Sequence, residues 1–582
     1  DAARAARPSD KELFDTLWEH MQALVSVRAD LPTSDMVAIL GSMLRLSFSG
    51  VERGPEALNT VNLVIAFTRV QLERRTTFPD IGAASTTNQI LSFLLSPLRV
   101  YQNPLQILDL KDYQRLLGSQ SDYIQKSVST AIVTAMLQRE TIMSTVEQVK
   151  GVLLLCTKLI AGVSVTRPDM SSHKGSSSSS ARGSSVSRTP VVDEVEIAEE
   201  QGLLARLVHQ IRCEEPETQA LALVAARNAF LGGRVEYTFP SIVTAAINIV
   251  HQYGETKPVA SASDSQHDGA ADNGEAAGES NGEEKQAEED DDGGGAAQAK
   301  ADAKAVTQIE EDIGEWRRKV QHLLRFIQMS IDKIPEEVTA LRLSIMAAQA
   351  VASEQAFAGE VEIEEAAYEL FVQAFTVYEE RVSDSRVQYD VLMQLLGAVH
   401  TSRNFSKDNF ETLAEKCVVY GKKLLKRPDQ ARAAYACAYL WWRGDSTTDN
   451  SDNVFEQLLR SHKIAEAVFD PAVRLQLLIE LLNRAVILYE RECSSVTPKY
   501  LTDMIQLIRS SLEAEDVFDD SEATKVRRLG AASNVSDSSP ADPSSLWTPA
   551  DESPREWIPR FFAETLEYIE SGEFPGVRTN PL

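Results

Sequence analysis

The sequence predicts an all-α protein, an extended HEAT-like helical-repeat solenoid with disordered inserts. Three observations lead to this prediction. Amphipathic helical patterns follow one another along most of the chain, capping residues and prolines mark where many of them begin, and no alternating strand pattern separates them. Helices in series that each have one apolar face must stack on their neighbours to bury it, and such a stack is a solenoid.

The N-terminal part, from Lys11 to about Val165, is predicted to form the first helices. Apolar residues recur there three or four positions apart, which places them on one face of a helix. One such stripe is Leu13, Leu17, Met21 and Leu24, and a second, after a Ser34-Asp35 cap, is Val37, Leu40, Met43, Leu44 and Leu46.

Two internal segments lack the apolar residues that a core needs. Ser171 to Pro190 is a Ser/Arg/Gly tract, and twelve acidic residues with one Lys lie between Asp264 and Asp292. Neither segment can bury enough surface to offset chain entropy, so we expect disordered loops between helices. We interpret them first as tolerated insertions, with phosphorylation sites or an acidic docking tail as the alternative.

The helices between and after the inserts are more regular. Their stripes include Leu221, Val224, Ala225 and Phe230, then Val320, Leu323, Leu324, Ile327 and Ile331, and then Ala367, Leu370, Phe371, Ala374, Phe375 and Tyr378. Small alanines among large residues let neighbouring helices approach closely. Two such helices with their turns make a unit of about forty to forty-seven residues, the length of a HEAT repeat.

The clearest helix start is Asp470-Pro471. Asp470 can cap the free N–H groups of the first turn, and Pro471 has no N–H to leave unpaired there. The same signal occurs at Thr497-Pro498, Pro428-Asp429, Ile334-Pro335 and Phe239-Pro240.

These patterns divide the chain into seven segments. They are helical repeats from the middle of a solenoid (1–168), a Ser-rich disordered loop (169–192), helical repeats (193–254), an acidic disordered insert (255–305), C-terminal helical repeats (306–516), a polar linker (517–553) and a terminal helix (554–573).

Composition narrows the class of protein. The 582 residues have a net charge of −28, which argues against a general nucleic-acid binder because such a protein needs a basic surface. No run of apolar residues is long enough to predict a membrane span. The five cysteines lie far apart and form no CxxC pair, so we expect reduced thiols and a cytoplasmic location.

No arrangement of residues predicts catalysis, and we expect no catalytic residue, cofactor or metal. His209 and Cys213 lie four positions apart, but two ligands without a second pair favour a half-buried helix face over a metal site. Gly232-Gly233 has no following Lys-Ser/Thr, so it is not a phosphate loop. In Trp441-Trp442, the two rings of a helix would point about 100° apart, which leaves the second ring as a candidate partner contact.

Several motifs together resemble the large subunit of retromer, the vacuolar protein sorting solenoid of a cargo-recycling coat. The resemblance is dense from Glu199 to Leu512, and its order and spacing are more informative than any single motif. The motifs are Glu199 to Leu203, Tyr378 to Arg386, Lys423 to Gln430, and Asp470-Pro471 with Leu477 to Arg484.

The resemblance implies a scaffold without enzymatic activity, peripheral on the endosomal membrane. In that family a metallophosphoesterase-like subunit sits in the C-terminal half, an arrestin-like subunit binds the N-terminal end, and sorting nexins attach the assembly to the membrane. Transmembrane cargo is returned to the Golgi or the plasma membrane. The family's Pro-Arg-Leu-Tyr-Leu element does not occur here, so we expect the arrestin-like contact to be missing. We expect membrane association to be indirect.

The family's C-terminal halves pair into arches, and two charged corners of this chain suggest how. Glu379, Glu380 and Asp384 form an acidic corner at a helix end, and one repeat later Lys422, Lys423, Lys426 and Arg427 crowd another. The helix dipole explains positive charge at a helix end but not the acidic pair. We therefore expect a homodimer contact in which Glu379, Glu380 and Asp384 face Lys423, Lys426 and Arg427 of a second copy.

Two other classes of protein stay open on the sequence alone. Another helical-repeat scaffold, such as a nuclear transport receptor or a phosphatase scaffold, would show the same helical pattern without this set of motifs. An all-helical enzyme would need a deep pocket lined by converging titratable groups.

Overall fold

The computed structural model describes residues 10–28, 30–49, 55–162, 194–258, 293–444, 448–514, 553–572 and 574–579. Across these residues the protein is all-α, as predicted, and its nearest approach to β-structure is an isolated bridge between Met143 and Ile211. The Ser-rich loop and most of the acidic insert and polar linker lie outside the described residues.

The N-terminal half consists of eleven labelled α-helices and one 3₁₀ helix within the described residues. They are α1 (Asp10–Val27), α2 (Thr33–Ser49), α3 (Pro55–Arg74), α4 (Ala84–Val100), η1 (Pro104–Asp109), α5 (Tyr113–Gly118), α6 (Asp122–Gln138), α7 (Val146–Leu155), α8 (Thr157–Ile160), α9 (Glu194–Val208), α10 (Pro216–Phe230) and α11 (Val235–Glu255).

The C-terminal half continues the same pattern with longer helices. They are α12 (Gly293–Ile331), α13 (Glu337–Ala352), η3 (Gln355–Phe357), α14 (Val361–Arg381), α15 (Ser385–Thr401), α16 (Lys407–Lys423), α17 (Arg427–Ala438), η4 (Tyr439–Trp441), α18 (Ser451–Glu466), α19 (Pro471–Glu490), α20 (Pro498–Glu513) and α22 (Pro554–Ser571).

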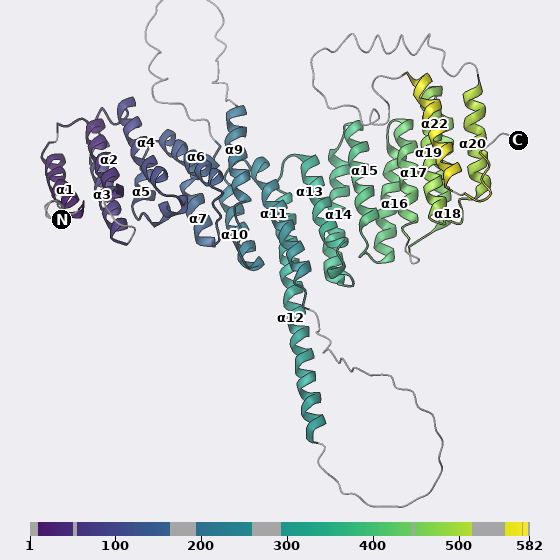
Figure 1. Cartoon of the computed structure of the whole chain (residues 1–582), viewed down its shortest axis with the longest axis horizontal. Helices are drawn as coiled ribbons and strands as arrows, with labels where there is room; N and C mark the ends of the chain where they lie inside the picture. Colours follow the sequence, from purple (N-terminus) through teal and green to yellow (C-terminus); the bar gives the residue numbers. More distant parts are fainter. Residues whose placement is uncertain are drawn as a thin grey trace, which may run out of the picture.

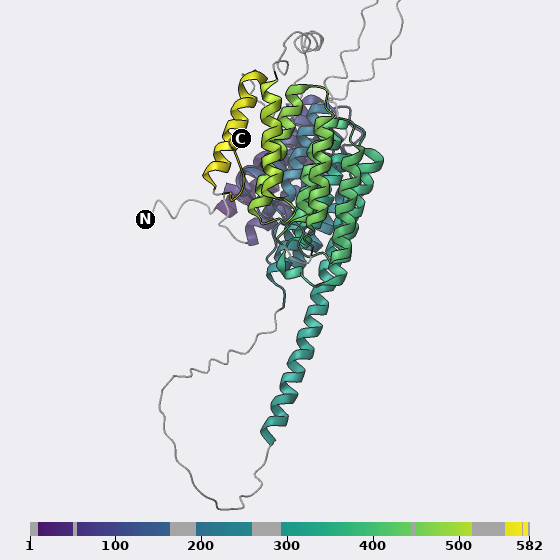
Figure 2. The same ribbon diagram turned by 90° about the vertical axis from the view of Figure 1, so that its right-hand side faces the viewer.

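The helices stack in two rows, which is the architecture of a solenoid (Figures 1 and 2). In the first row each helix packs on the next, in the order α2, α4, α6, α9, α11, α13, α15, α17 and α19. In the second row α7 packs on α10, α10 on α12, and α12 on α14. The buried residues form one continuous core from Phe14 to Ile569, as expected when each helix buries its apolar face on its neighbours.

Two predicted stripes were wrong in phase. In α1 the buried side chains are Phe14, Trp18 and Val25, while Leu17 and Leu24 are exposed. In α10 the core face is Ala222, Leu223, Ala226 and Phe230, and the predicted Leu221 and Val224 face solvent. Both helices have apolar residues on two sides, so spacing alone did not identify the packed side.

Two of the predicted caps in the C-terminal half, at Asp470 and Thr497, are confirmed, whereas α17 has no side-chain cap and α13 is capped by Glu336. Asp470 Oδ1 accepts hydrogen bonds from the backbone N–H groups of Ala472 (2.9 Å) and Val473 (3.3 Å) at the start of α19. Thr497 caps α20 by accepting from the Tyr500 N–H at 3.2 Å. These bonds satisfy N–H groups that the helix itself leaves free.

Two helix starts differ from the prediction. α11 begins at Val235, so Pro240 lies inside it, next to the fully buried Phe239, and the helix lacks one backbone hydrogen bond there. α2 begins at Thr33, before the predicted Ser34-Asp35 cap, and its first N–H donates at 2.6 Å to Asp80, a residue far along the chain.

α12 is the longest helix, and it begins at Gly293, inside the range assigned to the acidic insert. The alanines that follow Gly293 have high helix propensity, which the acidic composition of the segment obscured. The first part of α12 extends away from the stack (Figures 1 and 2).

Candidate functional site: the turn edge of the C-terminal repeats

The predicted acidic corner is the turn between α14 and α15. Glu379 and Glu380 lie in the last turn of α14, as predicted, and Val382 is buried behind them. Asp384 caps α15: its Oδ1 accepts from the N–H groups of Arg386 (2.8 Å) and Val387 (3.3 Å). These backbone hydrogen bonds lower the pKa of Asp384, so it is ionised at neutral pH.

The predicted basic corner is the turn between α16 and α17, and it spans two helix ends. Lys422 and Lys423 end α16, where the dipole favours positive charge. Lys426 and Arg427, however, lie at the N-terminus of α17, where the dipole opposes it. The helix dipole therefore does not explain these two cations, contrary to the sequence-based interpretation.

The two corners lie next to each other within one chain. Lys423 Nζ is 3.5 Å from Glu379 Oε1, and the Tyr420 hydroxyl donates to Glu379 Oε2 at 3.0 Å. Burial, and then this hydrogen bond, raise the pKa of Tyr420 to about 12. The Lys423 and Glu379 side chains are 62% and 55% exposed, so their ion pair is weak and open to exchange with another partner. The predicted pairing of these corners between two copies stays a prediction.

The same edge continues on both sides of these corners. Gln373 of α14 donates to Asp332 at the end of α12, and Arg427 Nη1 donates at 2.8 Å to the Ala467 carbonyl after α18. We call this surface the turn edge: the turns between α12 and α13, α14 and α15, α16 and α17, and α18 and α19, in that order.

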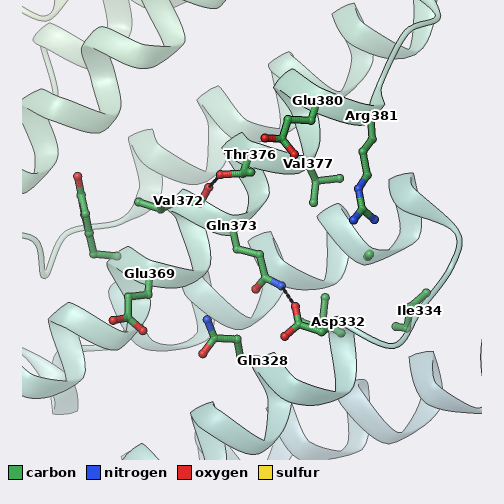
Figure 3. Close-up of a pocket in the computed structure, with 13 residues that line it drawn as sticks. Gln328, Asp332, Ile334, Glu369, Val372, Gln373, Thr376, Val377, Glu380 and Arg381 are labelled. Atoms are coloured by element: carbon green, nitrogen blue, oxygen red, sulfur yellow. Dashed lines mark hydrogen bonds between the residues drawn. The ribbon is translucent and has the colours of Figure 1, made fainter.

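An open groove of about 570 Å³ reaches the turn edge between α12 and α14 (Figure 3). Glu380 and Arg381 lie at one end of it, and Gln328 and Glu369 lie toward the other. Its apolar lining includes Ile331, Ile334, Val372 and Val377. The groove is open to solvent rather than enclosed, which suits docking of a side chain or peptide better than enclosure of a reacting substrate.

The turn edge also exposes two large apolar residues that the sequence analysis did not single out. Phe469 is 98% exposed and Leu425 is 78% exposed. No signal in the sequence indicated this exposure, because each residue follows an apolar neighbour, Val468 or Leu424, that is buried.

The remaining predicted residues have structural explanations. Trp441 is buried, and Trp442 is half-buried with its Nε1 donating to the Arg491 carbonyl at 2.8 Å. α9 ends at Val208, so His209 and Cys213 are not on one helix. Within the described ranges, no three His, Cys, Asp or Glu side chains gather closely enough to hold a metal ion.

The Glu199 to Leu203 motif joins α9 to the repeat before it. Glu200 pairs with Lys126 of α6 at 2.8 Å, and Gln201 donates to the Leu159 carbonyl at 2.8 Å from a fully buried position. Glu200 and Gln201 therefore hold α9 against the preceding repeat, which gives this motif a structural role in the stack.

A family comparison agrees with this architecture. The family model described as "Vacuolar protein sorting-associated protein 35" matches residues 2–511. The chain belongs to this family. The resemblance to the retromer large subunit that the motifs indicated is thereby confirmed.

Curated relatives have the same name in several organisms. Vacuolar protein sorting-associated protein 35B of Arabidopsis thaliana is 24% identical over 516 residues, which is 87% of this chain and 55% of the relative. The 35A protein of the same plant is 25% identical over 570 residues, 96% of this chain and 57% of the relative. The Schizosaccharomyces pombe protein is 23% identical over 518 residues, 87% of this chain and 51% of the relative.

The chain spans about half the length of the curated relatives it matches. Among the helices described, none combines the length and the hydropathy that a membrane crossing requires.

Proposed function

We propose that this chain is a non-enzymatic scaffold subunit of retromer, in the cytoplasm and peripheral on endosomal membranes. There it takes part in returning transmembrane cargo to the Golgi or the plasma membrane. The observation that carries the proposal is membership of the vacuolar protein sorting-associated protein 35 family over residues 2–511. The two-row solenoid supports it, because a long stack of repeats offers docking surface to several proteins at once. Family membership also disfavours a nuclear transport receptor or a phosphatase scaffold.

The metallophosphoesterase-like subunit is proposed to bind to the C-terminal repeats, residues 306–516. Sorting nexins and cargo join through the full complex, so membrane association is indirect. Support comes from the family resemblance and from the length of the described stack in this region, α12 to α20.

The test is direct binding of the 582-residue chain to the recombinant metallophosphoesterase-like subunit. We expect a stable complex on gel filtration, with new protection from hydrogen exchange confined to α12–α20. A nuclear transport receptor would bind a small GTPase instead. Absence of the complex would refute the partner assignment, and protection only in α1–α11 would refute its location.

The proposed function includes self-association through the two charged corners. Glu379, Glu380 and Asp384 of one copy would face Lys423, Lys426 and Arg427 of the other. The ion pair that Glu379 and Lys423 form within one chain would be replaced by ion pairs between the two chains. Each ion pair contributes about 1 kcal/mol or less and weakens with salt.

Sedimentation at low salt tests this contact with the variant Lys423→Glu/Lys426→Glu/Arg427→Glu. We expect the monomer–dimer equilibrium to shift toward monomer. The matched control is Arg74→Glu/Lys111→Glu/Lys150→Glu, which makes the same change in net charge at exposed residues of the N-terminal half. An equal response of the two variants, or no response of the first, would discard the assignment.

A further inference from the structure

Phe469 and Leu425 are large, exposed apolar side chains on neighbouring turns of the turn edge, and we call the two together the ridge. Phe469 lies in the turn between α18 and α19, and Leu425 lies in the turn between α16 and α17. The Arg427–Ala467 hydrogen bond joins these two turns. Each turn is anchored by the preceding residue, since Val468 and Leu424 are buried, so neither exposed side chain is needed to hold its turn.

The groove lies at the other end of the same edge. Along the edge the groove occupies the interval between the first and second turns, with Ile334 on one side and Glu380 and Arg381 on the other. The ridge occupies the interval between the third and fourth turns. An exposed aromatic side chain can bury its ring against the apolar part of the groove, which Ile331, Ile334, Val372 and Val377 line.

The symmetry of the proposed homodimer relates these two features. Pairing the acidic corner with the basic corner of a second copy requires a two-fold axis between the second and third turns. The same rotation places the fourth turn of one copy opposite the first turn of the other. The interval that carries the ridge then faces the interval that contains the groove, twice per dimer.

We propose that Phe469 and Leu425 of one copy dock into the Ile334–Glu380 groove of a second copy, and that this is the apolar centre of the self-association. The inference rests on the proposed homodimer. It adds the contact that determines which turns of the two copies lie opposite each other. The second copy is favoured over an unrelated partner because one axis brings together both the opposite charges and the ridge with the groove.

Sedimentation equilibrium of the whole chain tests the ridge. Phe469→Ser should weaken self-association by at least about tenfold, since buried aromatic anchors dominate binding at interfaces. The matched control is Val361→Ser, which removes a 65% exposed apolar side chain from the first residue of α14, at the opposite edge. Neither change removes a core contact, and circular dichroism should confirm equal folding of both variants.

The groove is tested by Thr376→Trp, because Thr376 is an exposed residue that lines it and an indole there would obstruct it. This variant should weaken self-association as much as Phe469→Ser. A mixture of the two variants should associate more strongly than either alone, because the heterodimer retains one intact ridge-and-groove contact. In about 0.5 M salt the effect of Phe469→Ser should persist while that of the Lys423 charge-reversal variant fades.

The outcomes separate the two proposals. A wild-type chain that stays monomeric at every concentration would overturn both. A wild-type dimer that responds to charge reversal but not to Phe469→Ser, or a mixture no stronger than its components, would overturn the docking of the ridge and leave the charged contact standing.

Discussion

The joint between α17 and α19 contains a buried ion pair whose loss should open the solenoid locally. Arg432 of α17 and Glu480 of α19 form two hydrogen bonds, of 2.9 and 3.0 Å, and their side chains are only 7% and 8% exposed. Tyr435 and Gln476 also donate to Glu480, at 3.0 and 2.8 Å. Burial alone would lower the pKa of Arg432, but the hydrogen bonds and charge of Glu480 raise it.

Glu480→Gln keeps the shape of the side chain and removes its charge. The Arg432 cation then stays buried without a counter-ion, and breaking such a pair from one side costs about 3–5 kcal/mol. Each 1.36 kcal/mol is a factor of ten in an equilibrium constant, so local opening should rise by roughly 10²- to 10⁴-fold. Because repeats contact only their neighbours, the effect should be confined to α15–α20.

Hydrogen exchange with mass spectrometry measures this opening directly. Peptides from α17 and α19 should exchange much faster in Glu480→Gln, and peptides from α2 and α4 should not change. Glu379→Gln is the matched control, because it removes one carboxylate from an exposed pair and should shift stability by about 1 kcal/mol or less. Unchanged exchange in α17 and α19 would refute the reasoning that Arg432 is desolvated and needs Glu480 as its counter-ion.

Three further changes have defined outcomes. Asp470→Ala removes the cap of α19 and should lower stability by about 1 kcal/mol, seen as faster exchange in its first turn. Gly233→Ala should lower the thermal midpoint, because a Cβ there would lie 2.1 Å from the Ile160 carbonyl oxygen, whereas Gly232→Ala has open space and should not. Burial, and then nearby positive charge, lower the pKa of His400 from 6.5, so its contribution to stability is complete above that pH and is lost as pH falls toward the folded-state pKa. Melts at about pH 7.5 and 5.5 should therefore differ less in His400→Gln than in wild type.

The sequence predicted the features that depend on neighbouring residues. The cap at Asp470 and the helix end at Glu379 follow from a few adjacent side chains, and the structure has both. The sequence-based prediction failed where distant residues take part. The N–H of Thr33, where α2 begins, donates to Asp80, and α11 continues through Pro240 instead of starting there. The sequence also did not identify which face of a helix is buried where apolar residues lie on two sides, and Leu17, predicted on the core face, is exposed.

The candidate site was only half predictable for the same reason. Charge at Glu379 and Lys423 is visible in the sequence, but their contact within one chain depends on how the repeats stack. Exposure of Phe469 is likewise a tertiary property, because an apolar residue between two helix patterns reads equally well as the end of a buried face.

The proposed homodimer needs more than its charges. Three acidic and three basic residues per copy can form a few exposed ion pairs across the axis, each contributing about 1 kcal/mol or less. Association itself costs an estimated 4–15 kcal/mol in lost translational and rotational freedom. Ion pairs alone would therefore set orientation and the rate of encounter without giving a stable dimer. A buried apolar contact repeated twice by symmetry supplies the missing contribution, and Phe469 with Leu425 is the pair that the turn edge leaves uncovered. A dimer that kept its strength without Phe469 would need another apolar surface on this edge.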